Sequence, residues 1–225
     1  MIENLKISNG ASDKNGITFY IRGICYGIRA SIGKYGEIRT DKIVKTNTNP
    51  MLLILLLFGV YREVLYLLGT TNWLYHIPTF VFVGWTLLSV IFMLSQKEIR
   101  KYHGAEHKVA NCWRKHKTLD VGAVRECSRI HNNCGTNIMA EIAVFQIISS
   151  VCMTYFNIHV PEIITIAAPL LLYNRFPFNL FGRLMQYITT ANPDEKHLQV
   201  GICALEEILE VAEKDLEMIR QQNEE

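Results

Sequence analysis

The sequence has no cysteine pattern of the kind that frames a small disulfide-bonded domain. Its six cysteines are scattered over 225 residues, and no two of them stand in a Cys-x-x-Cys spacing. Secreted domains that depend on disulfides carry denser and more regular cysteines. We therefore expect reduced thiols, most of which fill the core as small apolar side chains, with one or two available as metal ligands.

Several signatures of common enzymes and binding proteins are also missing. The chain has no serine-nucleophile motif, no glycine-rich phosphate-binding loop and no dinucleotide fingerprint. The first fifty residues contain no apolar run that resembles a signal peptide, so the N-terminus is expected to be cytoplasmic. The missing motifs argue against a serine hydrolase with a nucleophile elbow and against a nucleotide-dependent enzyme of the common types.

Charge is missing from two long apolar stretches. Residues 51–61 and 77–95 contain no charged side chain, although charged residues make up 20% of the chain and its mean hydropathy is +0.13. Such stretches are typical of membrane-spanning helices, which need about 20 apolar residues to cross the hydrocarbon core. We predict about four transmembrane or re-entrant helices, over residues 50–69, 76–96, 137–156 and 161–173, the last of which is short for a full span.

Basic residues are unevenly distributed around these helices. Residues 96–137 carry nine Lys or Arg, whereas the links at 70–77 and 157–160 carry none. By the positive-inside rule the basic stretch faces the cytoplasm, which explains its charge without a nucleic-acid partner. The sequence thus predicts an integral protein of the cell membrane, with the lipid bilayer as its partner, and leaves the formation of a homo-oligomer open.

Three polar regions flank the apolar ones, and the fold class is mainly α with a small β-rich part. Residues 15–48 alternate β-branched and aromatic residues, with turns near Gly33 and Gly36, which indicates two or three short strands. An amphipathic helix starts after Asn192 and Pro193. Its apolar stripe consists of Leu198, Ile202, Leu205, Leu209, Ala212, Leu216 and Ile219. The predicted domains are a cytoplasmic N-terminal cap (1–49), a membrane domain (50–176) with a cytoplasmic loop (96–137), and a cytoplasmic C-terminal helical segment (177–225).

A charged pair, Arg62 and Glu63, interrupts the first predicted span. A charged side chain inside a bilayer is costly unless it is paired. The pair marks the interfacial end of a shorter span, or it makes a buried polar contact. We expect the first.

The stretch "YHGAEHK", residues 102–108, contains the strongest chemical signal. Residues 96–113 are predicted to extend the second membrane helix into the cytoplasm, and positions four apart share one face of a helix. His103 and His107 can then bind one divalent metal, with zinc as the expected ion, and Glu106 lies close to the same face. This order, His-x-x-Glu-His, is that of a reversed zinc-protease motif in which the glutamate is the general base.

A second cluster, "HNNC", places His131 and Cys134 three apart at the start of the third predicted span. Both clusters flank one cytoplasmic loop, so the helix ends can bring them together. Three of the four ligands with an open position would make a catalytic zinc centre, and all four would make a closed structural one. The sequence leaves this choice open.

The motifs "YHGAEHK", "SRIHNNCGT" and "ITTANPDEKHLQVGICAL" resemble, in the same order, the YqhQ family of bacterial membrane proteins, a domain-of-unknown-function group described as predicted metal-dependent enzymes. The resemblance spans residues 17–205. It places His103, Glu106, His107, His131 and Cys134 at matching family positions, and Thr189, Thr190, Pro193 and Asp194 in the C-terminal signature. Asp194 and Glu195 become candidates to ligate the metal or to orient a ligating histidine. The Asp194 carboxylate would also interact favourably with the positive N-terminal end of the last helix.

Three functions remain, and nothing in the sequence selects a substrate. The first is a membrane-embedded metal-dependent hydrolase with Glu106 as base, acting at the cytoplasmic membrane face. The second is a non-catalytic membrane scaffold with a structural metal site. A metal-transport accessory protein would need a polar path, for which the candidate residues are Arg62, Glu63, Glu141, Gln146 and Glu162.

Overall fold

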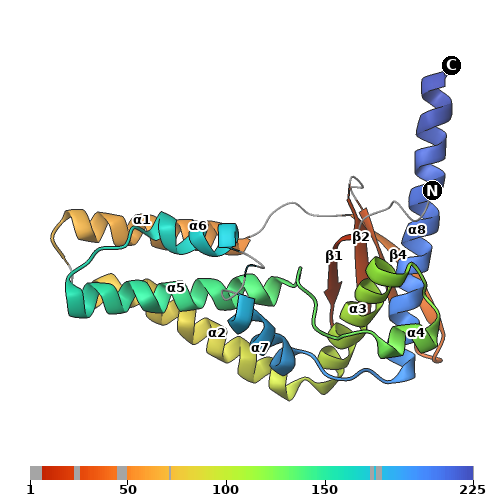
Figure 1. Cartoon of the computed structure of the whole chain (residues 1–225), viewed down its shortest axis with the longest axis horizontal. Helices are drawn as coiled ribbons and strands as arrows, with labels where there is room; N and C mark the ends of the chain where they lie inside the picture. The colour runs from red at the N-terminus through yellow and green to blue at the C-terminus, as the bar shows by residue number, and fades with distance from the viewer. Residues whose placement is uncertain are drawn as a thin grey trace. The chain divides into compact units, whose positions relative to one another are not determined.

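The structure is a computed structural model that describes residues 7–22, 26–44, 50–70, 72–172, 175 and 179–224. The chain folds into two compact units, each assembled from segments far apart in sequence (Figure 1). The sheet unit comprises Met1–Thr46, Met93–His131 and Thr189–Glu225, and the helical unit comprises Asn47–Phe92 and Asn132–Ile188. The predicted cap, most of the basic loop and the C-terminal helix therefore share one unit.

Four antiparallel strands form the sheet, in the spatial order β1-β2-β3-β4. They are β1 (Ile7–Ser12), β2 (Gly16–Ile21), β3 (Tyr26–Ile32) and β4 (Ile38–Val44). Alternation along β2 buries Ile17, Phe19 and Ile21 completely or nearly so. Gly36, with φ of +86°, makes the turn between β3 and β4. The predicted N-terminal β-rich part is confirmed.

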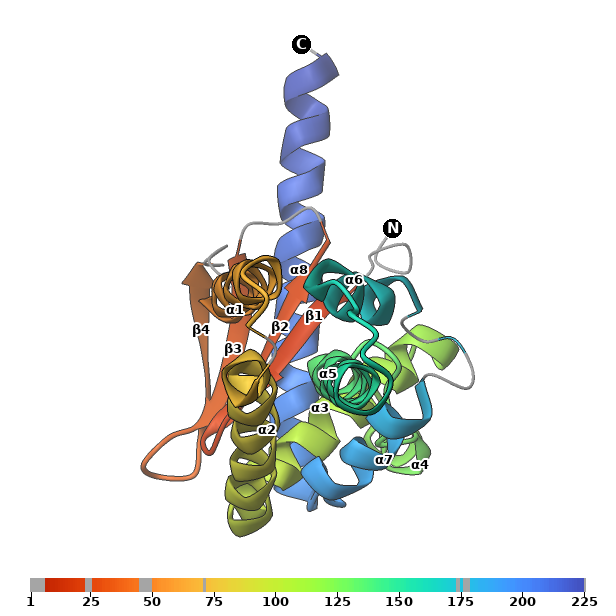
Figure 2. The ribbon, with the colours of Figure 1, turned by 90° about the vertical axis from the view of Figure 1, so that its left-hand side faces the viewer.

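Three helices complete the sheet unit: α3 (Lys97–His116), α4 (Val121–Glu126) and α8 (Glu195–Glu224). Helix α8 packs on β2 and β3, and α3 packs on β1 and α8. Figure 2 shows α8 running along the strands. The described part of the predicted α8 stripe is buried, namely Leu198, Ile202, Leu205, Leu209 and Ala212. Leu216 and Ile219 lie outside the described side chains.

The helical unit contains only helices among its described residues. They are α1 (Pro50–Leu67), the 3-10 helix η2 (Trp73–His76), α2 (Ile77–Ser95, which continues three residues into the sheet unit), α5 (Gly135–Phe156), α6 (Glu162–Leu172) and α7 (Asn179–Thr189). The cysteines of the described residues, Cys112, Cys127, Cys134, Cys152 and Cys203, form no disulfide bond with one another, as predicted, and Cys25 lies outside the described residues. The chain is mainly helical, as expected.

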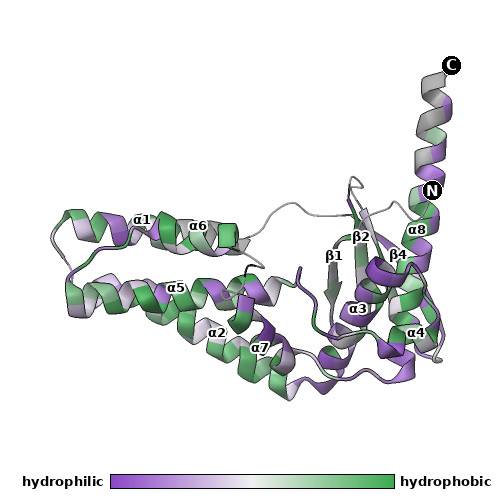
Figure 3. Ribbon diagram, in the orientation of Figure 1, coloured by the Kyte–Doolittle hydropathy of each residue, from purple (hydrophilic) through white to green (hydrophobic). Residues whose placement is uncertain are grey.

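Two helical stretches within the described residues are long and apolar enough to cross a membrane, Trp73–Ser95 and Gly135–Phe156 (Figure 3). Only 17% of the apolar window in Trp73–Ser95 is buried, whereas the core helix of a soluble protein is mostly buried. Helix α6, with 11 residues, is shorter than a span. The structure thus supports two of the four predicted spans. The span over 50–69 stays a prediction, because the side chains of 50–56 lie outside the described residues.

Arg62 corrects one expectation. Its side chain is 1% exposed, so it makes the buried polar contact that was the less expected of the two alternatives. One terminal nitrogen, Nη1, donates to Gln146 Oε1 at 3.1 Å and pairs with Glu162, while Nη2 donates to the hydroxyls of Tyr75 at 2.9 Å and Ser149 at 2.8 Å. These partners come from η2, α5 and α6. Because they neutralise the guanidinium and satisfy most of its N–H groups, the buried position is tolerated.

A second correction concerns the histidine-bearing helix. The predicted continuous extension of the second span is wrong, because α2 ends at Ser95 and α3 begins at Lys97. Gln96 between them has ψ of 75°, outside the helical region. The stretch "YHGAEHK" therefore lies on a helix of its own, within the sheet unit.

Candidate metal centre

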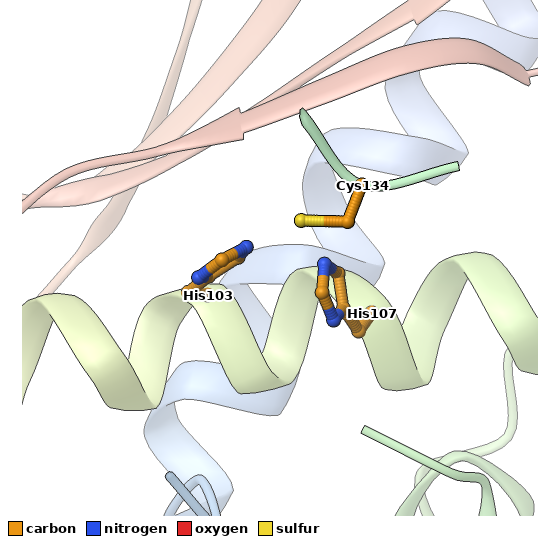
Figure 4. Close-up of side chains that lie close together, drawn as sticks. All are labelled: His103, His107 and Cys134. Carbon is orange, nitrogen blue, oxygen red and sulfur yellow. The ribbon is translucent and has the colours of Figure 1, made fainter. Parts of the chain in front are cut away.

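Helix α3 places His103 and His107 on successive turns of one face (Figure 4). The ring centroids are 4.4 Å apart and the ring planes are inclined by 66°. The two side chains are 8% and 1% exposed. The four-residue spacing therefore produces the paired, buried imidazoles that the sequence predicted.

The thiol of Cys134 completes a compact group. The candidate ligand atoms of His103, His107 and Cys134 all lie within 4.8 Å of one another, and all three residues are buried (Figure 4). In a tetrahedral zinc site with bonds of about 2.0–2.3 Å, neighbouring ligand atoms are about 3.3–3.8 Å apart. Cys134 precedes the first residue of α5 in an extended conformation, and its Sγ lies 3.0 Å from Thr136 Oγ1. The group could hold a metal ion after small side-chain adjustments.

Backbone oxygens select the protonated nitrogen of both histidines. His103 Nδ1 lies 3.2 Å from the carbonyl oxygen of Thr189, and His107 Nδ1 lies 2.6 Å from that of Arg129. A carbonyl oxygen only accepts, so each Nδ1 carries a proton. Burial lowers the pKa of His103 and lowers that of His107 well below its usual value, which keeps the rings neutral. A neutral ring protonated at Nδ1 carries its lone pair on Nε2.

His107 Nε2 gives the clearest sign that a ligand belongs here. It is buried and has no hydrogen-bond partner among the described residues. A buried polar atom without a partner loses free energy relative to its hydrated state. A lone pair next to a second imidazole and a thiol fits a borderline-soft divalent cation. These residues therefore fit the metal that the sequence suggested.

His131 lies beside this group. Its ring centroid is 5.5 Å from that of His107, and its Nδ1 lies 2.8 Å from Asn111 Oδ1. Burial and the Arg114 guanidinium lower the pKa of His131 to about 4, so this ring is neutral as well. The group whose ligand atoms lie within 4.8 Å does not include His131. Its role as a ligand stays a prediction.

Glu106 faces the sheet. Its carboxylate hydrogen bonds to Ser12 of β1, and a Cβ atom at Gly10 would overlap it. Burial raises the pKa of Glu106 to about 7, partly offset by the Ser12 hydrogen bond. The carboxylate does not belong to the compact ligand group of His103, His107 and Cys134. The general-base role therefore stays a prediction.

Gly104 explains how the Thr189 carbonyl reaches His103. A Cβ atom at Gly104 would overlap the carbonyl oxygen of Ala191, and the N–H of Ala191 donates to Arg100 O at 2.8 Å. The segment before α8 therefore lies directly on α3. Close packing against Ala191 therefore explains why a glycine stands in "YHGAEHK", and this role was not predicted from the sequence.

Asp194 and Glu195 both pair with cations. Asp194 forms an ion pair with Lys101 of α3, and Glu195 Oε2 lies 2.9 Å from Arg125 Nη2 of α4. These contacts attach the start of α8 to its neighbours. A role beside the metal stays a prediction for both.

Three residues that hold the imidazoles were not predicted in that role. Arg129 and Thr189 act through backbone carbonyls, which have no sequence signal because every residue has one, although Thr189 belongs to the C-terminal family signature. Asn111 had a signal, since it lies four residues after His107 and thus on the same face of α3.

Comparison with known proteins matches residues 37–211 to the family described as "Protein of unknown function (DUF1385)". "Uncharacterized protein YqhQ" of Bacillus subtilis (strain 168) is 28% identical over an alignment of 158 residues, which covers 61% of this chain and 48% of that protein. The chain thus spans about half the length of this curated relative. No solved structure matches. The matched region contains all three residues of the ligand group, and the chain belongs to the DUF1385 family of proteins of unknown function, to which its motifs had pointed.

Proposed function

We propose that the protein is a metal-dependent hydrolase of the membrane surface, with His103, His107 and Cys134 as the metal ligands. The observation that carries the proposal is the compact buried group of two imidazoles and a thiol, in which His107 Nε2 has no partner among the described residues. The donor set favours zinc over magnesium or calcium, which prefer oxygen ligands.

The chemistry follows from the residues around this group. A zinc-type cation supplies Lewis acidity and lowers the pKa of water at such a site. The carbonyls of Arg129 and Thr189 hold the imidazoles in the orientation that directs Nε2 away from the backbone. Glu106, one residue before His107, takes the proton from the attacking water and passes it to the leaving group.

A position in the membrane supports this function. Trp73–Ser95 exposes most of its apolar surface, which a bilayer would cover. The nine basic residues of 96–137 favour the cytoplasmic side for the histidines and for both termini. The substrate class would then be a peptide, a lipid-linked molecule or an amide that reaches the cytoplasmic membrane face.

The Glu106→Gln variant tests the hydrolase proposal. Full-length protein in detergent would be assayed against fluorogenic peptides, esters and amides, with the zinc content measured in the same samples. We expect Glu106→Gln to keep its zinc and to lose about 100-fold or more of the hydrolysis rate, because proton transfer by a positioned side chain contributes that much. Glu126→Gln, on the exposed side of α4, is the matched control and should behave as wild type. Equal rates in Glu106→Gln and wild type would contradict the proposal.

A structural metal site is the second candidate, and the position of His131 favours it. The ring lies 5.5 Å from His107, close enough to become a fourth ligand after a small shift. Cobalt-substituted protein separates the two candidates. An open site changes its visible spectrum when azide binds, and a closed site of four protein ligands does not. The hydrolase proposal further expects His131→Ala to retain cobalt.

A further inference from the structure

Asn111 continues the row of His103 and His107 on α3. It lies four residues after His107, and its side chain is 3% exposed. The row is thus two imidazoles followed by an amide, all on one face of one helix in the sheet unit. A buried amide needs hydrogen-bond acceptors for its nitrogen and a donor for its oxygen.

The hydrogen bonds of Asn111 determine which way its amide points. The Nδ2 group donates to the carbonyl oxygens of Ser128, at 2.8 Å, and Ile130, at 2.9 Å. Neither carbonyl can donate, so the nitrogen must be on that side, and Oδ1 must face His131. His131 Nδ1, 2.8 Å away, is therefore the donor in their hydrogen bond.

The same loop also controls His107. Arg129 stands between the two residues that Asn111 holds, and its carbonyl oxygen accepts the proton of His107 Nδ1 at 2.6 Å. Asn111 thus acts on His131 directly and on His107 through the backbone of residues 128–130.

We propose that Asn111 is a positioning residue: its amide fixes residues 128–131 so that His107 and His131 both keep their proton on Nδ1, and His107 thereby offers Nε2 to a metal. This positioning follows from the hydrogen bonds, and only its use in metal binding rests on the proposed function. Partners of this kind set the tautomer and orientation of ligating histidines in metal sites.

Lys108 offers a matched control on the same helix. Its Nζ donates to the carbonyls of Arg125, at 2.7 Å, and Cys127, at 2.6 Å. It therefore also attaches α3 to two backbone carbonyls of this part of the chain. Its hydrogen bonds go to neither His107 nor His131, so removing them should weaken the attachment without changing a tautomer.

The test uses the full chain in detergent with ¹⁵N-labelled histidine. Long-range ¹H–¹⁵N spectra of the metal-free protein report which ring nitrogen is protonated, and competition with a chromophoric chelator gives the Zn²⁺ affinity. We expect wild type and Lys108→Met to show His107 and His131 protonated at Nδ1. In Asn111→Leu both rings should lose this preference, and the Zn²⁺ affinity should fall about 10- to 100-fold.

Asn111→Asp separates the two actions of the amide. A carboxylate still accepts from His131 but donates to neither Ser128 nor Ile130, so His131 should keep its tautomer while His107 loses its preference. This variant also decides the matter if Asn111→Leu does not fold.

Unchanged tautomers and Zn²⁺ affinity in folded Asn111→Leu or Asn111→Asp would overturn the proposal, and so would the same losses in Lys108→Met. Wild-type protein that binds no Zn²⁺ would instead defeat the proposed function, while the spectra of the metal-free protein would still decide the role of Asn111.

Discussion

At the scale of single residues, the oxygen atoms around the imidazoles matter as much as the imidazoles themselves. Each of three histidines directs Nδ1 at an oxygen that accepts a hydrogen bond. The oxygens are Thr189 O for His103, Arg129 O for His107 and Asn111 Oδ1 for His131. Neutral rings held in this way share one tautomer. A motif of two histidines becomes a candidate metal centre only with these partners in place.

Replacement of Gly104 should damage this arrangement. The Cβ of Gly104→Ala would overlap the carbonyl oxygen of Ala191, and the neighbouring Thr189 carbonyl holds His103. Overpacking of this kind costs about 1–3 kcal/mol. We expect a lower thermal midpoint and weaker Zn²⁺ binding. Gly84→Ala in α2 is the control, because a Cβ there meets nothing within 4 Å. A wild-type midpoint in Gly104→Ala would contradict the packing described here.

Residues whose side chains can bind a metal were easier to predict from the sequence than residues whose role is packing. His103, His107 and Cys134 were found from their spacing and type, and the structure brings them together. Gly104 was not, because a close backbone approach depends on a segment almost ninety residues away. Whether His131 is a ligand could not be read from spacing either, since its position depends on Asn111.

At the scale of elements, the Arg62 cluster ties four helical elements of the helical unit together. Arg62 of α1 bonds to Tyr75 of η2, to Gln146 and Ser149 of α5, and to Glu162 of α6. Because these groups bond to one another, they support a fixed arrangement of the four helical elements.

The cluster makes a prediction about helix stability. Arg62→Leu leaves the 2% exposed Glu162 without its cation, which should cost about 3–5 kcal/mol. Adding Glu162→Leu removes the stranded charge, so the double variant should be more stable than the single one. Thermal unfolding in detergent measures both. A double variant less stable than Arg62→Leu would show that the charge pair is not the reason for the loss.

The β1–β2 turn gives a prediction about pH. Both guanidinium ends of Arg29 reach the Asp13 carboxylate, at 2.6 and 2.7 Å, and this hydrogen bonding holds the pKa of Asp13 below its usual value. A folded pKa below the unfolded one adds stability above the unfolded value of about 3.9. That stability is lost as the pH falls through the folded pKa.

Asp13→Asn should therefore lower the stability near neutral pH, by about 1 kcal/mol or less because the carboxylate is half exposed. Its difference from wild type should shrink as the pH falls from about 3.9 through the lowered folded pKa of Asp13. Asp41→Asn, across from Arg29 on β4, is the control. Thermal midpoints measured over this pH range check the prediction, and a difference that does not change with pH would contradict it.

Element prediction succeeded where the pattern was local. Strands β2 to β4, α2, α5 and the buried stripe of α8 follow from alternation, apolar runs and helical spacing, whereas β1 lies before the predicted 15–48. Arg62 was misinterpreted because its partners lie 13 to 100 residues away, where no local pattern shows them. Helix α7 was not separated from α8, although Leu180, Leu184 and Tyr187 repeat at helical spacing along it.

At the scale of the whole molecule, α2 exposes an apolar surface that we expect to be buried against lipid or another protein. Phe80, Trp85, Leu88 and Ile91 are each more than half exposed. Patches of this size on a soluble monomer mark a missing partner or a membrane. The absence of charge over 77–95 favours the membrane.

We expect the full chain to resist extraction from cell membranes by alkaline carbonate. Arginine at both Leu87 and Leu88 should release a large fraction, because each charge at the centre of a membrane helix costs about 2.5–3.5 kcal/mol. Met218→Arg on α8 is the control and should stay with the membrane. Release of the wild-type chain by carbonate would contradict a membrane position.

The most direct test of the metal centre is elemental analysis of detergent-purified protein prepared under reducing conditions. Wild type is compared with a variant carrying both His103→Ala and His107→Ala, and with His116→Ala, which changes an exposed histidine of the same helix. The account predicts about one zinc per chain in wild type and His116→Ala, and none in the double variant. No metal in any sample, or equal metal in all three, would contradict it.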